Sequence, residues 1–216
     1  NGQLKKFTSD VTNTKYSNEI YVSQEIDDTV RNYNEQGQLT DYTYTHTDPS
    51  GNKNILIQER KYKNGRLDWT EENRINEDSI GKQLDKQTYR VDYTYESDAA
   101  DAKLLGVVST RSYFNGDSKQ AYRIESRADL RQYYEDGTLK SYYTKTIDEQ
   151  FDDKGSSVSK TEDRTYRYYD EQGKQIKSVA LSFAGDGTWA ANTITSIYGT
   201  ASGEEGKLIQ RISINQ

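Results

Sequence analysis

The sequence predicts an all-β protein: an antiparallel up-and-down meander of about eleven strands, arranged as an extended sheet or a wide open barrel. Three observations support this fold class. A glycine-centred turn unit returns along the chain, polar and apolar residues alternate with a period of two, and 216 residues contain a single proline. Short hairpin turns make neighbouring strands antiparallel. Long ladders need every backbone N–H, which proline lacks.

The recurring unit consists of an aromatic residue, a few polar residues, a glycine and then often Leu or Ile. Glycine supplies the positive φ of a tight turn, and Asn or Asp beside it tolerates left-handed backbone. Asn-Gly and Asp-Gly between alternating segments are the strongest short-range hairpin signal. We therefore expect a hairpin turn at each copy. The copies are Tyr33–Leu39, Tyr62–Leu67, Tyr134–Leu139 and Tyr169–Ile176, with weaker ones at Phe114–Gly116, Phe151–Gly155 and Glu204–Leu208.

Between these turns the sequence predicts strands, and the segments 76–85 and 97–103 read as polar loops. We expect one β-repeat domain over residues 1–216, with a bend or sub-domain break near 76–103. In chain order, the strands are expected near 19–33, 38–47, 54–63, 66–75, 86–96, 104–114, 122–134, 138–150, 157–169, 174–183, 188–198 and 207–215.

Two of these strands show the alternation most clearly. From Tyr89 to Tyr95 the odd positions are apolar or aromatic and the even positions are polar, which predicts one buried and one wet face. From Tyr122 to Tyr134 the charged residues fall on one face. We expect that charged face to be wet.

The composition is unusual for a folded domain. Apolar residues make up 31% of the chain and charged residues 30%, which favours disorder. The 19 tyrosines favour strands instead. The two facts agree if a thin core is formed by tyrosine rings and the aliphatic stems of long polar side chains. The net charge of −6 disfavours nucleic-acid binding. The charged residues Arg90 and Asp92, opposite the tyrosine face, argue against membrane insertion.

The turn units resemble two bacterial repeat families. Tyr62–Leu67 and Tyr134–Leu139, the latter followed by Lys-Ser, resemble units of MORN-variant, YwqK-like proteins. Tyr33–Leu39, followed by Thr47–Asn52, resembles an RHS/YD repeat, and Tyr169–Gly173 is similar to it. The resemblance implies stacked antiparallel hairpins and partner binding, and it transfers no catalytic residue. The spacing of the turn glycines is less regular in this chain than in those families.

Little in the sequence points to catalysis. The chain has no cysteine and one histidine, His46, which excludes disulfides, thiol chemistry and paired-histidine metal sites. Adjacent carboxylates such as Asp152 and Asp153 point to opposite faces of a strand, so they cannot cooperate by themselves. We expect no enzyme activity, no catalytic residue, no metal site and no cofactor.

The aromatic side chains are the best functional lead, because a thin sheet cannot bury them all and exposed Tyr and Trp are preferred contact residues. We name Trp69, Tyr93, Tyr133 and Trp189 as candidate partner-binding residues. The preferred function is a non-enzymatic bacterial module that binds a protein partner through a tyrosine-rich sheet face or an edge strand. A YwqK-like antitoxin or immunity protein that binds a basic toxin is an alternative, and a carbohydrate-binding or carbohydrate-active protein is another.

The expected location is extracytoplasmic: the cell surface, the periplasm or the medium. The chain lacks cysteine and also methionine, even at its first position. We therefore expect a processed chain from which any export signal or anchor upstream has been removed.

Overall fold

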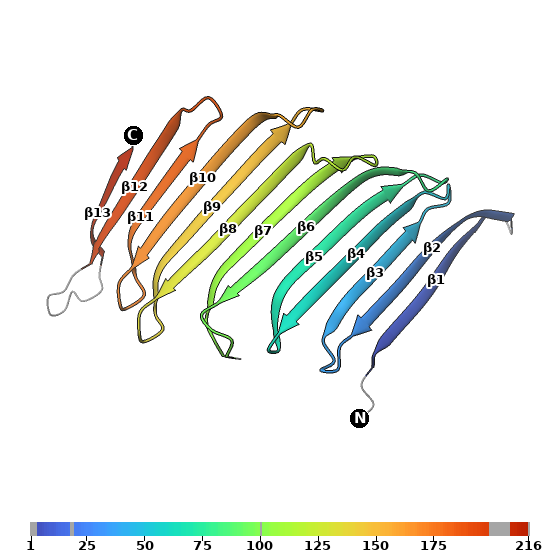
Figure 1. Cartoon of the computed structure of the whole chain (residues 1–216), viewed down its shortest axis with the longest axis horizontal. Coiled ribbons are helices and arrows are strands. Elements are labelled where there is room, and N and C mark those ends of the chain that lie inside the picture. The colour runs from blue at the N-terminus through green and yellow to red at the C-terminus, as the bar shows by residue number, and fades with distance from the viewer. Residues whose placement is uncertain (1–3, 18–19, 100, 199–207, 216) are drawn as a thin grey trace. The chain divides into compact units, whose positions relative to one another are not determined.

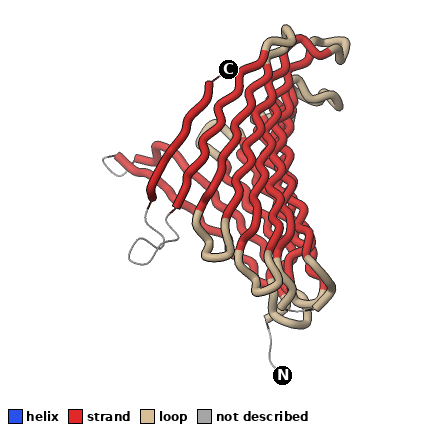
Figure 2. Tube along the Cα trace, turned by 90° about the vertical axis from the view of Figure 1, so that its left-hand side faces the viewer, coloured by secondary structure: helices blue, strands red, loops and turns tan. Residues whose placement is uncertain are grey.

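The computed structural model describes residues 4–17, 20–99, 101–198 and 208–215. These residues form thirteen β-strands and no helix (Figure 2). In chain order the strands are β1 (Lys6–Ser17), β2 (Ile20–Tyr33), β3 (Leu39–Thr47), β4 (Lys53–Lys63), β5 (Arg66–Glu77), β6 (Gln83–Tyr95), β7 (Leu104–Asn115), β8 (Arg123–Tyr133), β9 (Leu139–Phe151), β10 (Ser157–Tyr169), β11 (Gln175–Phe183), β12 (Trp189–Tyr198) and β13 (Leu208–Asn215).

Each strand is hydrogen-bonded to its neighbours in sequence, in the order β1 to β13 without a crossover (Figure 1). The all-β antiparallel meander is thus confirmed, with thirteen strands rather than about eleven. The sheet is not closed, so the extended form of the prediction holds and the barrel form does not. Within the described part of the chain, no helix is long and apolar enough to cross a membrane.

The chain divides into two compact units. Unit 1 consists of Asn1–Asp92 and Thr110–Arg123, and unit 2 consists of Tyr93–Ser109 and Ile124–Gln216. Unit 1 therefore holds β1 to β5 and unit 2 holds β9 to β13. The strands β6, β7 and β8 each contribute residues to both units.

Five turns share one hydrogen-bond pattern, which explains why the turn unit recurs. An Asn or Asp at the first position accepts, through its side-chain oxygen, the backbone N–H groups two and four residues later. The glycine three residues later donates its N–H to the carbonyl of that first residue. The first residues are Asn34, Asp48, Asp78, Asp152 and Asp170, and the side-chain bonds measure 2.8 to 3.1 Å.

The turn at Asp78 corrects one prediction. The segment 76–85 is not a polar loop, because β5 continues to Glu77 and β6 begins at Gln83. The turn between them was missed because no aromatic residue precedes Asp78.

Two further turns follow the chemistry that the sequence indicates. Asn64 and Gly65 both have positive φ, 51° and 80°, as a two-residue type I′ hairpin requires. Gly137 has a φ of 93° between β8 and β9, as predicted. There the side chain of Asp136, rather than the first residue of the turn, accepts the N–H of Thr138 at 2.8 Å.

Neither unit has a conventional core. Among the described apolar side chains, only Val91 and Ala121 are buried. On β8 the expected contrast between a dry and a wet face is absent: Leu130 on the apolar face is 45% exposed, whereas Arg131 on the charged face is half-buried. The reason is that no second layer of described residues covers either face of the sheet within a unit. The alternation of polar and apolar residues therefore does not predict which face is buried.

Arginine and lysine side chains on aromatic rings take the place of a core. Arg31 lies 5.5 Å from the ring centroids of both Phe7 and Tyr42. At least ten such contacts occur among the described residues, where about three are usual for a chain of this length. Each contact also packs an aliphatic stem on the sheet, which keeps apolar surface from water.

Candidate binding surface

The strand register in unit 2 gathers apolar side chains on one face of the sheet. Residues paired across antiparallel strands share a face. One such row runs from β9 to β13 through Tyr143, Tyr166, Val179, Thr193 and Ile214. The next rows place Leu181 beside Ala191 and Phe183 beside Trp189.

We call this surface the aromatic face of unit 2. It comprises Leu130, Tyr143, Tyr166, Tyr168, Val179, Leu181, Phe183, Trp189, Ala191, Ile212 and Ile214. The opposite face of β10 to β12 carries small and hydroxyl side chains instead, among them Thr165, Ser178, Ala180 and Ser182. Most of the large apolar side chains of this part of the sheet therefore lie on one side, although Ile194 lies on the other, paired with Ser178.

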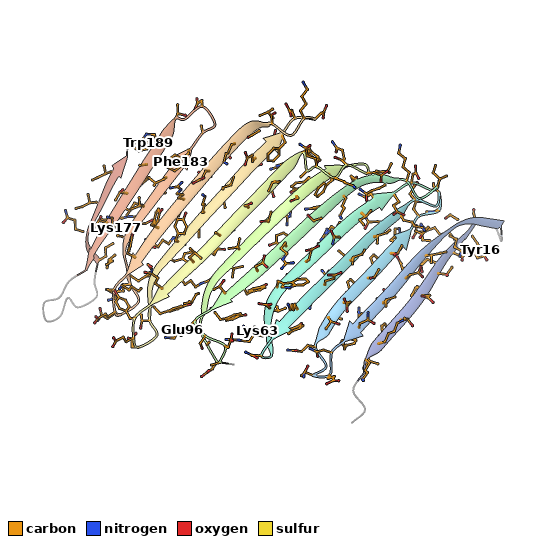
Figure 3. The ribbon with its side chains drawn as sticks, in the orientation of Figure 1. Tyr16, Lys63, Glu96, Lys177, Phe183 and Trp189 are labelled. Atoms are coloured by element: carbon orange, nitrogen blue, oxygen red, sulfur yellow. The ribbon has the colours of Figure 1, made fainter. Side chains whose placement is uncertain are left out.

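Much of the aromatic face is open to solvent. Trp189 is 58% exposed, Ile214 is 53% exposed and Tyr168 is 39% exposed. Phe183 and Trp189 lie side by side at the ends of β11 and β12 that face their connecting turn (Figure 3). Contiguous exposed apolar patches are rare on monomeric proteins and usually mark an interaction site.

A hollow of about 290 Å³ lies at the β8 to β10 side of the aromatic face. Its lining includes the apolar and aromatic residues Leu130, Tyr143, Tyr166 and Tyr168, together with the polar Gln132 and Arg167. The rings of Tyr143 and Tyr166 are 4.7 Å apart and tilted by 36°. Burial, with the neighbouring Tyr166, raises the pKa of the Tyr143 hydroxyl, which therefore stays neutral across physiological pH.

Glu162, Arg164 and Lys145 form a charged cluster within the aromatic face. Glu162 accepts hydrogen bonds from Arg164 and, at 3.2 Å, from Lys145. Burial opposes ionisation of Glu162, but the bonds from Arg164 and Lys145 outweigh it and lower the pKa. The guanidinium of Arg164 also lies 5.0 Å from the Phe183 ring centroid. With two cations and one carboxylate, the cluster keeps a net charge of +1 beside the Phe183 ring.

Acidic turns border the aromatic face. The β8–β9, β9–β10, β10–β11 and β11–β12 turns carry Asp136, Asp152, Asp170 and Asp186 respectively. Hydrogen bonds from Thr138 lower the pKa of Asp136, and bonds from Thr188 lower that of Asp186. The carboxylates of Asp136 and Asp186 are therefore held ionised at the rim.

The four residues predicted from sequence do not form one site. Trp69 lies on β5 in unit 1, half-buried under Arg90. Tyr93 is half-buried on β6. Tyr133 donates its hydroxyl to the carbonyl of Leu104 at 3.0 Å and so ties β8 to β7. Only Trp189 belongs to the aromatic face.

The sequence reasoning passed over Tyr143, Tyr166, Leu181 and Phe183. The run Val179-Ala-Leu-Ser-Phe183 carries the relevant signal, because its large apolar residues alternate with small ones. Such a run indicates one strongly apolar sheet face.

A hydrogen-bonded triad surrounds the single histidine in unit 1. The hydroxyl of Tyr44 donates to Asp27 Oδ1 at 2.7 Å, and His46 Nδ1 lies 2.8 Å from the same oxygen. The bond to Asp27 raises the pKa of Tyr44 to about 12, and the bonds from Tyr44 and His46 lower the pKa of Asp27. Across the described residues, no three His, Cys, Asp or Glu side chains are grouped to hold a metal ion.

Comparison with protein-family models, curated proteins and solved structures finds no match for this chain.

Proposed function

We propose that this chain is a non-enzymatic binding module that recognises a protein partner through the aromatic face of unit 2. The observation that carries the proposal is the apolar face on β9 to β13, where Tyr168, Trp189, Ile212 and Ile214 are exposed beside half-buried apolar side chains, with Trp189 more than half exposed. Aromatic anchors inside a polar rim are the usual composition of a protein interface.

The negative charge of the rim predicts the charge of the partner's surface. Unit 2 contains 18 Asp and Glu against 13 Lys and Arg, an excess of five negative charges that lies mostly in its turns and loops. Complementary charge at a rim speeds association and selects partners. The partner should therefore present an apolar patch bordered by basic side chains.

The proposed setting is a bacterial one outside the cytoplasm, supported by the absence of cysteine and by the hairpin units that resemble bacterial repeat proteins. The basic rim expected of the partner is also compatible with an antitoxin role. Identification of the partner separates these two settings.

The test is capture of partners by a triple variant in which Tyr168, Trp189 and Ile214 are changed to serine. All three side chains are exposed, so the fold should survive, as circular dichroism can verify. Proteins retained by the wild type and lost from the variant are identified and their affinities then measured with purified components.

The matched control changes two comparably exposed apolar residues in unit 1, Ile80 and Leu84, to serine. We expect the control to bind as the wild type does and the triple variant to lose at least a hundredfold in affinity. Binding that survives the triple variant but is lost when residues 97–103 are altered would place the site on that loop and refute the proposal. Loss of a glycan ligand instead of a protein would assign the face to carbohydrate.

A further inference from the structure

The face of unit 2 that is opposite to the aromatic face carries a group of arginines around one tyrosine. Tyr142 on β9 pairs with Arg167 on β10, so these two side chains share a face. The Tyr142 hydroxyl donates to Asp129 Oδ1 on β8 at 2.7 Å. Residues two apart on a strand share a face, which adds Arg127 and Arg131. We call these five residues the arginine cluster, and their strands are neighbours in the sheet (Figure 1).

The arginine cluster contains one carboxylate, and that carboxylate is already bound. Arg127 donates to Asp129 twice, from Nε at 2.9 Å and from Nη2 at 3.0 Å, and the Tyr142 hydroxyl is a third donor. Burial opposes ionisation of Asp129, but the bonds from Arg127 and Tyr142 outweigh it and lower the pKa. Asp129 is therefore charged at neutral pH and balances the guanidinium of Arg127.

The other two arginines lie against the ring of Tyr142 instead of against a carboxylate. The guanidinium carbons of Arg131 and Arg167 are 5.4 Å and 5.7 Å from the ring centroid. Neither arginine forms an ion pair with a described carboxylate, although Asp129 attracts Arg131 from a longer distance. Arg131 Nη1 is buried and has no hydrogen-bond partner in the described part of the chain. With three guanidinium groups and one carboxylate, the arginine cluster keeps a net charge of +2 in a unit with an excess of five negative charges.

The positions of these two arginines restrict the ligand. They approach Tyr142 from the strands on either side of β9. Neighbouring strands lie about 4.8 Å apart, so positions on β8 and β10 are about 10 Å apart. In an extended peptide, side chains two residues apart point the same way and are separated by about 7 Å. Long, flexible side chains on both molecules can close the difference. A segment with two carboxylates therefore matches the arginine cluster better than one small anion does.

Nucleic acids and sugars fit the arginine cluster less well. Tyr142 is half-buried, and guanidinium groups from both neighbouring strands lie on its ring, which is then not open to stack against a base or a sugar. A nucleic acid would also bring its phosphates close to the acidic remainder of unit 2. A short acidic segment meets mainly the local positive charge, because salt screens charges beyond about 10 Å.

We propose that the arginine cluster binds an acidic segment of a protein partner in which two Asp or Glu residues are separated by one residue. One carboxylate would accept bonds from Arg131 and the other from Arg167, because guanidinium groups present planar donor pairs that match a carboxylate. The arginine cluster and the aromatic face lie on opposite faces of the same strands. The acidic segment therefore belongs to a second partner, and the two sites can be tested independently.

The test is an NMR titration of the full chain with acetyl-Gly-Glu-Ser-Glu-Gly-amide, whose only charges are its two side-chain carboxylates. The matched neutral probe is acetyl-Gly-Gln-Ser-Gln-Gly-amide. We expect saturable shifts at Arg131, Tyr142 and Arg167 with the glutamate peptide alone. Because Arg167 is exposed, Arg167→Gln should keep the fold, and it should weaken binding at least tenfold.

The matched control is Arg31→Gln in unit 1. Arg31 is also exposed and lies 5.5 Å from two aromatic ring centroids, but it is one guanidinium beside two rings rather than one of two guanidinium groups beside one ring. This variant should bind the glutamate peptide as the wild type does. The triple variant of the aromatic face should also bind it unchanged.

A further variant gives a result that misfolding cannot produce. Asp129→Asn removes the carboxylate of the arginine cluster and keeps its shape, so the glutamate peptide should bind severalfold more tightly. No saturable binding, equal binding of the glutamine peptide, unchanged affinity in Arg167→Gln or no gain from Asp129→Asn would overturn the proposal. Tighter binding of pentathymidylate than of the glutamate peptide would also overturn it, in favour of a nucleic acid.

Discussion

The guanidinium of Arg90 lies 4.1 Å from the centroid of the Trp69 ring, although no second layer of described residues in unit 1 covers either side chain. Trp69 pairs with Asp92 and Glu71 pairs with Arg90, so the contact runs diagonally between β5 and β6. A side chain that would be solvated on most surfaces here covers an aromatic ring. Contacts of this kind replace the core that a single-layer sheet lacks.

We predict that Arg90→Ala lowers the free energy of unfolding by about 1 to 2 kcal/mol, from the lost cation–π contact and the lost packing of the stem. Urea unfolding followed by tryptophan fluorescence measures this. Lys82→Ala, at an exposed turn position in the same unit, should change the free energy of unfolding by less than about 0.5 kcal/mol. Equal effects of the two substitutions would contradict the proposed role of the stacked arginine.

The recurring turn makes a separate prediction at Asp170. Its side chain accepts the N–H of Gln172 at 3.0 Å and that of Lys174 at 2.8 Å. Asp170→Ala should destabilise the protein by about 1 to 2 kcal/mol, because two backbone donors lose their partner, while Asp170→Asn should retain most of the stability. Thermal unfolding of both variants, with Glu171→Ala as the neighbouring control, tests the assignment.

Gly137 should tolerate substitution poorly. Its φ of 93° is strained for any residue with a Cβ, and a Cβ there would lie 3.2 Å from Lys103 Nζ. We expect Gly137→Val to cost more than about 1 kcal/mol and Gly137→Asn to cost less than the valine variant, since Asn tolerates positive φ. If Gly137→Val melts at the wild-type temperature, the turn is not at this position in solution.

The triad of Asp27, Tyr44 and His46 predicts a pH dependence at high pH. The pKa of Tyr44 in the folded chain is about 12, above its ordinary value near 10. A raised folded-state pKa contributes stability below pH 10 that is lost as pH rises towards 12. Tyr44 should therefore be a late-titrating tyrosine by ¹³C NMR, and Asp27→Asn should bring its pKa back towards 10.

At low pH the same triad predicts a loss of stability as the pH falls. The bonds from Tyr44 and His46 lower the pKa of Asp27, so its contribution to stability is present above about pH 4 and lost as the carboxylate is protonated below that. The acid limb of the stability profile should be shallower in Asp27→Asn than in the wild type. Identical acid limbs would mean that the triad does not form.

Local chemistry explains which parts of the fold were predictable. Turns such as Asn64-Gly65 can be predicted from residues that are adjacent in sequence. Such short turns make neighbouring strands antiparallel. Strand β1 was missed because Lys6–Ser17 is mainly Thr, Ser, Asn and Lys, with Phe7 and Val11 as its clearest apolar signals. The strand is formed by its backbone pairing with β2, which the side chains of β1 do not indicate.

The surface was harder to predict than the strands. Alternation on one strand says which side chains share a face, but not whether anything covers that face. Leu130 reads as a core residue and is 45% exposed, because no second layer of described residues lies over it in unit 2. The row from Tyr143 to Ile214 depends on the register of five strands, which one strand's sequence does not contain.

The most direct test of the central claim compares two adjacent positions on β10. Tyr168 points to the aromatic face and Arg167 to the opposite face, and both are exposed. A photoreactive phenylalanine analogue is placed at 168 or at 167, and covalent capture of the identified partner is measured. We predict capture from position 168 and little from position 167. Stronger capture from 167 would contradict recognition through the aromatic face.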